Sequence, residues 1–248
     1  MRTPLLVSET DTIEIVNDFP YLGSIISDSG TLSPELSARL GKASRAFGCL
    51  RNSIFTNRTL SIKTKVLVYR AVVLTTLLYG AETWPVKAEH LRRLNSFHHA
   101  CLRTILGISR RVQWEERLSS ATLGKLSGMD HDMAVVLQKY RLRWLGHVAR
   151  MEDSRLPKSL LFGELPHTRP PHGPKKRWRD IIVSDLASIG LTHSTWYEAA
   201  QDRKLWWARC QEQQERPRPP RVICPSCRRD FSRPSDLKRH QPYCKADK

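Results

Sequence analysis

The chain contains one long apolar segment from which its fold class can be read: Ser61-Ile-Lys-Thr-Lys-Val-Leu-Val-Tyr-Arg-Ala-Val-Val-Leu-Thr-Thr-Leu-Leu-Tyr-Gly80. Wound as an α-helix, this segment is apolar on nearly all sides, as the most buried helix of a globular protein is. Its most apolar part, residues 66–79, is interrupted by Arg70 and is too short to cross a bilayer. We therefore expect the central helix of a helical protein and no association with a membrane.

Amphipathic patterns on both sides of this segment predict further helices. Ser33 is a good N-cap residue and Pro34 suits the first helical position, so a helix is expected to begin there and to run to Leu50. Others are expected over residues 88–106, 132–150 and 194–214, and one more begins near Trp178. The helix over 194–214 is expected to bury Trp196, Ala200 and Trp207, and the one near Trp178 to bury Trp178, Ile182 and Leu186.

The predicted fold is mainly α, with two small β elements at its ends. Residues 12–26 have β character and a turn at Tyr21-Leu-Gly-Ser24, so residues 1–30 are expected to hold a short β segment. Residues 31–215 form the helical body. The stiff basic linker Arg216-Pro-Arg-Pro-Pro-Arg221 then leads to a small terminal module over residues 222–248.

This terminal module has the ligand spacing of a zinc finger. Cys224 and Cys227 are two residues apart, as on a tight hairpin, and His240 and Cys244 are four apart, as on one side of a helix. Phe231 and Leu237 supply the small core that such a ββα unit needs. The four side chains predict one structural Zn²⁺, and they leave no open position for an activated water.

The overall charge points to a polyanionic partner. The formal net charge is +17 and the pI is about 10.1. Such an excess is typical of nucleic-acid-binding proteins, and contacts to phosphates of RNA or DNA should dominate because one finger reads only about three base pairs. The alternative is a charged surface that serves only solubility.

Basic side chains gather in three places, where nucleic-acid contacts are expected. In the finger they are Arg228, Arg229, Arg233, Lys238 and Arg239. In a proline-rich loop over residues 156–179 they are Lys175, Lys176, Arg177 and Arg179, which could also act as a nuclear import signal. On the helix over 132–150 they are Lys139, Arg143 and Arg150, a face that is either a nucleic-acid track or simply solvated.

The cysteine pattern indicates a reducing compartment. Six cysteines in 248 residues do not form a disulfide framework, and Cys49, Cys101 and Cys210 are expected to be buried thiols. The first nine residues lack the apolar core of a secretory signal. We expect the nucleus, with the cytoplasm as the alternative.

Several ordered phrases resemble a known family. They are Phe19-Pro-Tyr-Leu-Gly-Ser24, Leu60-Ser-Ile-Lys-Thr-Lys65, Val68-Tyr-Arg-Ala71, Leu78-Tyr-Gly-Ala-Glu-Thr-Trp84, Cys101-Leu-Arg-Thr-Ile-Leu-Gly107, Arg143-Trp-Leu-Gly-His-Val148 and Gly173-Pro-Lys-Lys-Arg-Trp178. Their order over residues 18–210 resembles the region downstream of the palm in reverse transcriptases of LINE-type (non-LTR) retrotransposons. The resemblance implies a thumb-like helical body that grips RNA or an RNA–DNA duplex, with residues 1–30 as the remnant of a palm-proximal β segment.

Catalysis is not expected. The family's polymerase needs an aspartate pair that holds two metal ions, and the sequence contains no Asp-Asp pair. The adjacent His98 and His99 face different directions on a helix and form a poor metal pair. The sequence predicts a non-catalytic nucleic-acid-binding fragment of a retrotransposon reverse transcriptase. The alternatives are the C-terminal part of an RNA-directed DNA polymerase that is active only with its palm, and a zinc-dependent protein-interaction module.

Overall fold

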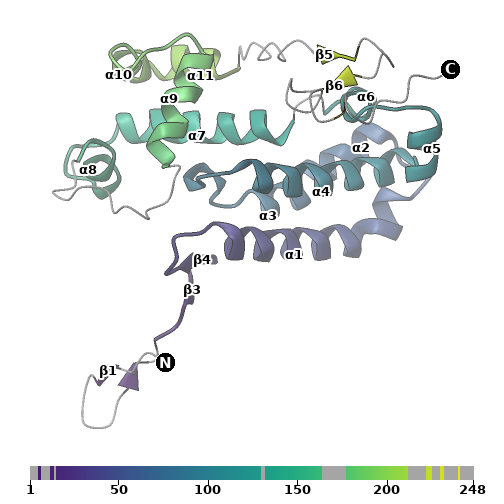
Figure 1. Cartoon of the computed structure of the whole chain (residues 1–248), viewed down its shortest axis with the longest axis horizontal. Helices are drawn as coiled ribbons and strands as arrows, with labels where there is room; N and C mark the ends of the chain where they lie inside the picture. Colours follow the sequence, from purple (N-terminus) through teal and green to yellow (C-terminus); the bar gives the residue numbers. More distant parts are fainter. Residues whose placement is uncertain are drawn as a thin grey trace.

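The computed structural model describes residues 5–6, 12–13, 15–129, 132–163, 177–211, 222–224, 230–231 and 240. Helices dominate these ranges, so the prediction of a mainly α fold is confirmed (Figure 1). In the part of the chain that is described, no helix is long and apolar enough to cross a membrane.

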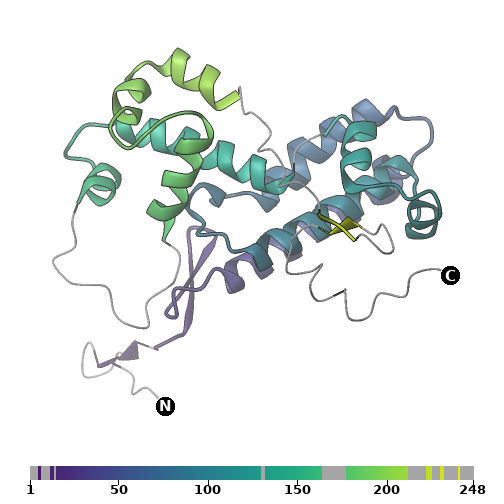
Figure 2. The ribbon, with the colours of Figure 1, turned by 45° about the horizontal axis from the view of Figure 1, so that its top comes forward.

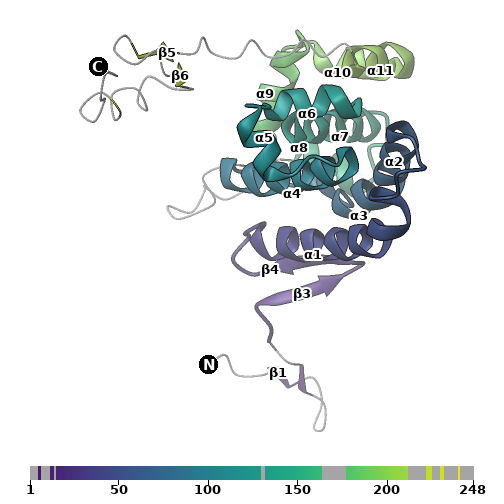
Figure 3. The ribbon, with the colours of Figure 1, turned by 90° about the vertical axis from the view of Figure 1, so that its right-hand side faces the viewer.

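Three long helices are stacked in layers (Figure 3). Helix α4, Ala88–Leu106, lies between α1, Ser33–Leu50, and α7, Met133–Ala149. Helix α4 has the predicted bounds, because Gly107 takes a left-handed φ of 71° that ends the helix. The Asp132 carboxylate accepts a hydrogen bond from the Ala134 N–H at 3.3 Å and so caps α7.

Helix α1 begins as predicted, but without the predicted cap. The Ser33 side chain does not bond to the backbone of the first turn; its hydroxyl lies 3.3 Å from Nε2 of His90 on α4. Pro34 is in the first turn, where its missing N–H costs nothing. Ser33 therefore joins two helices rather than capping one.

The apolar segment over residues 61–80 is less regular and less buried than expected. It forms α2, Ile62–Val68, a π-helical turn η2, Tyr69–Leu74, and the short α3, Thr75–Leu77. Ile62, Leu67 and Val72 keep 43%, 67% and 40% of their surface exposed, so the prediction of burial on all sides is wrong. The reason is that the segment packs against α1, α4 and α6 and leaves its remaining side uncovered.

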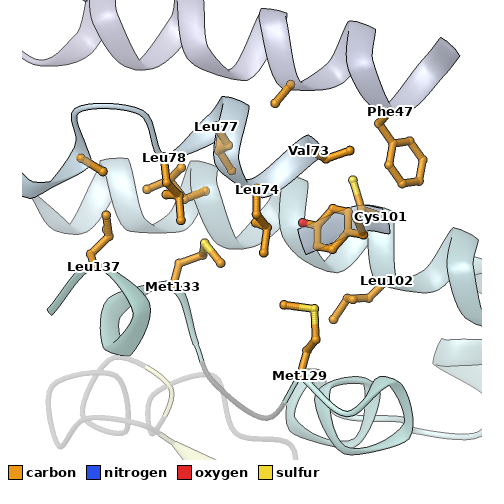
Figure 4. Packing of buried hydrophobic residues seen from close by; sticks show 14 of the residues in the cluster. Phe47, Val73, Leu74, Leu77, Leu78, Cys101, Leu102, Met129, Met133 and Leu137 are labelled. Atoms are coloured by element: carbon orange, nitrogen blue, oxygen red, sulfur yellow. The ribbon is translucent and has the colours of Figure 1, made fainter. Parts of the chain in front are cut away.

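The first of two hydrophobic clusters joins α1, the 61–80 segment, α4 and the start of α7. Figure 4 shows Leu74, Leu77 and Leu78 pointing toward Met133 and Leu137 across the interior. At the other end of this cluster Phe47 stacks on Phe55, with ring centroids 4.3 Å apart. Phe55 belongs to a second π-helical turn, η1, Arg51–Phe55, which continues α1.

The second cluster includes residues from the C-terminal end of α7. It brings together α9, Trp178–Ser188, α10, Trp196–Gln201, and α11, Arg203–Gln211. Figure 2 shows α9, α10 and α11 gathered over this end of α7. The buried pair Ile182 and Leu186 confirms the predicted core side of α9. Because α7 supplies residues to both clusters, it is the spine of the helical body.

The single helix predicted over residues 194–214 is in fact two. Asp202, with φ −80° and ψ 105°, breaks it, and its carboxylate caps the N–H groups of Lys204 and Leu205. The break shifts the helical register, so Trp206 is buried and Trp207 is 49% exposed. Trp207 was predicted to be a core residue, and that prediction is wrong.

Several short helices were not predicted. They are η3, Ala81–Thr83, α5, Arg110–Glu115, α6, Ser120–Ser127, and α8, Leu156–Phe162. Helix α8 corrects the prediction of a loop over residues 156–179, because the first seven of those residues are helical. Residues 164–176 of that loop lie outside the described residues.

In the described ranges, three antiparallel strand pairs accompany the helices. β3, Asp18–Tyr21, pairs with β4, Ser24–Ser27, in the register Tyr21↔Ser24, which confirms the predicted turn. β1, Leu5–Leu6, pairs with β2, Thr12–Ile13, and β5, Val222–Ile223, pairs with β6, Asp230–Phe231. The short β segment expected within residues 1–30 is therefore present.

Two of the three cysteines predicted to be buried are so. Cys101 and Cys210 are 3% and 1% exposed, and burial raises the pKa of the Cys101 thiol to about 12. Cys49 is exposed, which contradicts the prediction. It lies two residues after the buried Phe47, and on a helix this spacing turns a side chain to the opposite face.

Candidate nucleic-acid interface

The terminal module begins with an antiparallel strand pair that comes before and after the CxxC segment in sequence. β5 and β6 pair in the register Val222↔Phe231 and Ile223↔Asp230, and Cys224 follows β5 directly. The Cys224 side chain is completely buried, and His240, in helical backbone, is half-buried. Thiolate and imidazole are ligands that Zn²⁺ prefers, so these two residues fit the predicted donor set.

The rest of the predicted finger lies outside the described residues. Cys227 and Cys244 are two of the four expected ligands there, and no group of three or more metal-binding side chains occurs in the part of the chain that the structure describes. The predicted nucleic-acid contacts of the finger lie outside it as well: Arg228, Arg229, Arg233, Lys238 and Arg239. The finger and its zinc remain predictions.

The basic loop is described only at its end. Lys175 and Lys176 lie outside the described residues, whereas Arg177 and Arg179 are exposed at the start of α9. Between them Trp178 is half-buried, and its indole N–H donates a hydrogen bond to the Glu82 carbonyl at 2.7 Å. This bond ties α9 to η3, so Trp178 has the structural role that its sequence pattern predicts.

The strongest combination of charge and aromatic surface among the predicted contacts lies where α7 meets α11. We call it the α7–α11 seam, and its residues are Lys139, Tyr140, Arg143, Arg150, Arg203 and Trp207. The exposed Arg143 guanidinium carbon lies 5.3 Å from the ring centroid of Trp207 and 5.7 Å from that of Tyr140. Both distances are within the range in which a guanidinium is attracted to an aromatic ring.

Positive charge is concentrated at the seam, and it affects the pKa values of neighbouring groups. Burial, followed by repulsion from Arg203, lowers the pKa of Arg150. Burial raises the pKa of the Cys210 thiol to about 11, although Arg143, Arg150 and Lys139 act in the opposite direction. Among the described residues no carboxylate forms a salt bridge with any of the four cations of the seam. The seam can therefore accept anionic groups from solution.

The sequence pattern indicated Lys139, Arg143 and Arg150 of the seam, but it indicated neither Arg203 nor the two aromatic residues as parts of a binding surface. Tyr140 is half-buried against the first cluster, and its ring lies near Arg143. Trp207 was missed because the break at Asp202 is needed to turn it outward. The Asp-Arg pair after Gln201, a typical helix start, is the signal that could have revealed the break.

The two adjacent histidines behave differently from each other, as their spacing predicts. His98 is 1% exposed, and its Nδ1 lies 2.9 Å from the Tyr69 hydroxyl. Burial lowers the His98 pKa to about 4, and a smaller decrease applies to His99, which is half-buried. His98 is therefore a buried structural residue, whereas His99 is partly exposed at the surface.

Comparison with known proteins indicates the general origin of this helical, basic chain. It is similar to a protein of Caenorhabditis elegans named "Putative uncharacterized transposon-derived protein F52C9.6", with 29% identity over 206 residues, which cover 81% of this chain and 72% of that protein. No protein-family model matches the chain. No solved structure matches it either. The chain thus has a transposon-related origin.

Proposed function

We propose that this protein is a non-catalytic nucleic-acid-binding protein whose retrotransposon-related body grips RNA or DNA through the α7–α11 seam. The observation that supports this most strongly is Arg143, which lies 5.7 Å and 5.3 Å from the ring centroids of Tyr140 and Trp207, among cations that form no salt bridge within the described residues. Arginine binds phosphate oxygens through paired N–H donors, and exposed aromatic rings stack on bases. The similarity to a transposon-derived protein agrees with such a partner.

The terminal finger would act as a second, smaller contact. Cys224, Cys227, His240 and Cys244 would hold one Zn²⁺, which supplies folding free energy to the module and no chemistry. Basic side chains of the finger and of the loop before α9 would add phosphate contacts. Together they would give affinity with little sequence preference, and the nucleus is the expected compartment.

Binding to labelled RNA and DNA at several salt concentrations tests the proposal. For wild type, log affinity should fall linearly with log salt, by roughly 0.9 units for each phosphate contacted on duplex DNA. Changing Lys139, Arg143 and Arg203 together to glutamine should reduce this slope by about 2–3 units. The matched control changes the exposed Arg45, Arg58 and Lys63, which lie outside the seam, and it should keep the slope.

Two outcomes would refute the seam as the interface. One is a wild-type affinity that does not change between about 50 and 200 mM salt, the range in which phosphate contacts show their effect. The other is an equal loss of slope in the seam variant and in its charge-matched control, because the binding would then follow net charge alone.

A second candidate function has one specific observation in its favour. The β3–β4 hairpin exposes apolar side chains, with Phe19, Tyr21 and Ile26 at 53%, 55% and 57%. Such a surface is what the C-terminal part of an RNA-directed DNA polymerase would place against its palm. Template-dependent DNA synthesis restored by adding a separately expressed palm would favour this function over the first.

A further inference from the structure

An open cleft of about 940 Å³ lies between α4 and α5, and no residue of the α7–α11 seam lines it. The lining side chains with charge, hydrogen-bonding or stacking capacity are His99, Arg103, Arg110, Gln113, Trp114 and Arg117. None of them was predicted to be functional. The volume is at the upper end of the range of roughly 300–1,000 Å³ that ligand sites occupy.

Trp114 is the most unusual residue of this cleft. Its side chain is 82% exposed, the highest value among the large apolar residues described here. Exposing an indole to water costs free energy that burial would recover, and helix α5 holds it at the mouth of the cleft rather than in the core. Its ring faces remain available for stacking.

Three arginines converge on the same cleft from different parts of the chain. Arg103 comes from α4, Arg110 from the start of α5, and Arg117 from the turn after it. Among the described residues none of the three forms a salt bridge. The carboxylate that also lines the cleft, Glu115, is paired instead with Arg111, at 2.7 Å.

Hydrogen bonds hold this arrangement in place. The Gln113 side-chain oxygen accepts from Arg103 at 3.2 Å, and its amide group donates to the Leu118 carbonyl at 3.1 Å. Arg117 takes a left-handed φ of 50°, which is unfavourable for a residue with a Cβ, and its N–H donates to the Trp114 carbonyl at 3.2 Å. Arg117 lines the same cleft as Arg103 and Arg110.

The cations of the cleft are close enough to repel one another. The pKa of Arg103 is lowered by burial and then by the positive charge of Arg110. The pKa of His99 is lowered by burial, so this imidazole is neutral near pH 7 and can accept or donate a hydrogen bond. An anionic group placed between the arginines would relieve their repulsion.

We infer that the cleft between α4 and α5 binds single-stranded nucleic acid, with a base stacked on Trp114 and the adjoining phosphates held by Arg103, Arg110 and Arg117. Every base has a flat aromatic face, and only an unpaired base can place that face on an exposed indole. The inference rests on the proposed nucleic-acid binding and assigns the single-stranded part of it to a site separate from the seam. A phosphopeptide would use the arginines alone and would give no role to the indole.

Fluorescence anisotropy with a labelled oligo-dT of about 12 nucleotides, a length within the known site sizes, tests the cleft directly. Trp114→Ala should weaken binding of this single strand at least about fivefold, whereas Trp114→Phe should keep most of it because phenylalanine also stacks. Arg110→Gln should reduce the salt slope by about 0.7 units, the value for one phosphate of a single strand. Arg45→Gln, the same charge change on an exposed residue of α1, should leave the slope unchanged.

A second readout shows whether the indole itself contacts the base. Oligo-dT should quench part of the tryptophan fluorescence of wild type. This quenching should be absent from Trp114→Phe, although that variant still binds the oligonucleotide. A labelled duplex serves as the comparison, because its affinity should fall in the seam variant and not in Trp114→Ala.

The inference is overturned if Trp114→Ala binds oligo-dT as wild type does, or if a phosphopeptide of equal charge displaces the oligonucleotide equally well. Failure of the broader proposal looks different, since wild type would then bind neither the single strand nor the duplex. Loss of single-strand and duplex binding to the same extent in Trp114→Ala would also refute a separate site.

Discussion

Replacing Gly146, in the middle of α7, is expected to destabilise the protein even when the new residue is alanine. A Cβ built on this residue would lie 2.3 Å from Nε1 and 2.6 Å from Cδ1 of Trp206. The Trp206 indole is 2% exposed and donates a hydrogen bond to the Leu142 carbonyl at 3.0 Å, so it has little freedom to move. Gly146→Ala must therefore displace a buried ring.

The expected loss of stability follows from three contributions. Overpacking costs about 1–3 kcal/mol, and leaving the indole N–H buried without its acceptor costs about 1–3 kcal/mol. The higher helix propensity of alanine returns about 1 kcal/mol. The free energy of unfolding should thus fall by about 1–5 kcal/mol.

Gly41 in α1 is the matched control, because nothing lies within 4 Å of a Cβ built there. Gly41→Ala should raise the free energy of unfolding by about 0.5–1 kcal/mol through helix propensity alone. Urea unfolding followed by circular dichroism measures both variants. If Gly146→Ala is as stable as wild type, the close packing of Trp206 against α7 is wrong.

Three further predictions concern buried groups and the metal. His98 is protonated near pH 6.5 in the unfolded chain and near pH 4 in the folded chain. The free energy of unfolding should therefore fall by about 3 kcal/mol as the pH falls through this window. In His98→Asn the free energy of unfolding should change much less with pH across the same window. Asp185→Leu should lower the free energy of unfolding by about 3–5 kcal/mol, measured in urea, because it leaves the buried Arg141 guanidinium without the carboxylate 2.7 Å away. A much smaller loss would contradict a buried ion pair between these residues. The double variant Asp185→Leu/Arg141→Met should regain part of the lost stability. Cys227→Ser should reduce the zinc content, measured by metal analysis, from one ion per chain toward none, and full zinc retention would exclude the predicted ligand set.

Local patterns were sufficient where neighbouring residues determine the structure. The bounds of α4 follow from an apolar stripe and from Gly107, and the β3–β4 turn follows from Leu22 and Gly23, whose φ values are 46° and 84°. The seam cations on α7 were found in the same way, since Lys139 and Arg143 are one helical turn apart. These signals act over a few residues.

Features that depend on distant contacts were not predictable. The pairing of Arg141 with Asp185 joins residues 44 positions apart, and no periodic pattern marks it. The cleft at Trp114 depends on where the chain places α5 relative to α4, and α5 has only six residues, too few for a helical period to be recognised. Its exposed tryptophan could have been suspected only from the arginines around it in sequence.

The two proposed binding surfaces should respond differently to a substitution in α7, the helix that contributes residues to both hydrophobic clusters. The seam depends on α11, which is held to α7 by Trp206, and Trp207 is the next residue of that helix. The cleft depends on α4 and α5, and α4 packs in the first cluster together with Met133 and Leu137 from the other half of α7. Gly146→Ala, which pushes Trp206 outward, should therefore weaken duplex binding at the seam several-fold while oligo-dT binding at the cleft is kept. Equal loss of both affinities in the folded variant would mean that the two surfaces act as one, and the assignment of single strands to the cleft would have to be given up.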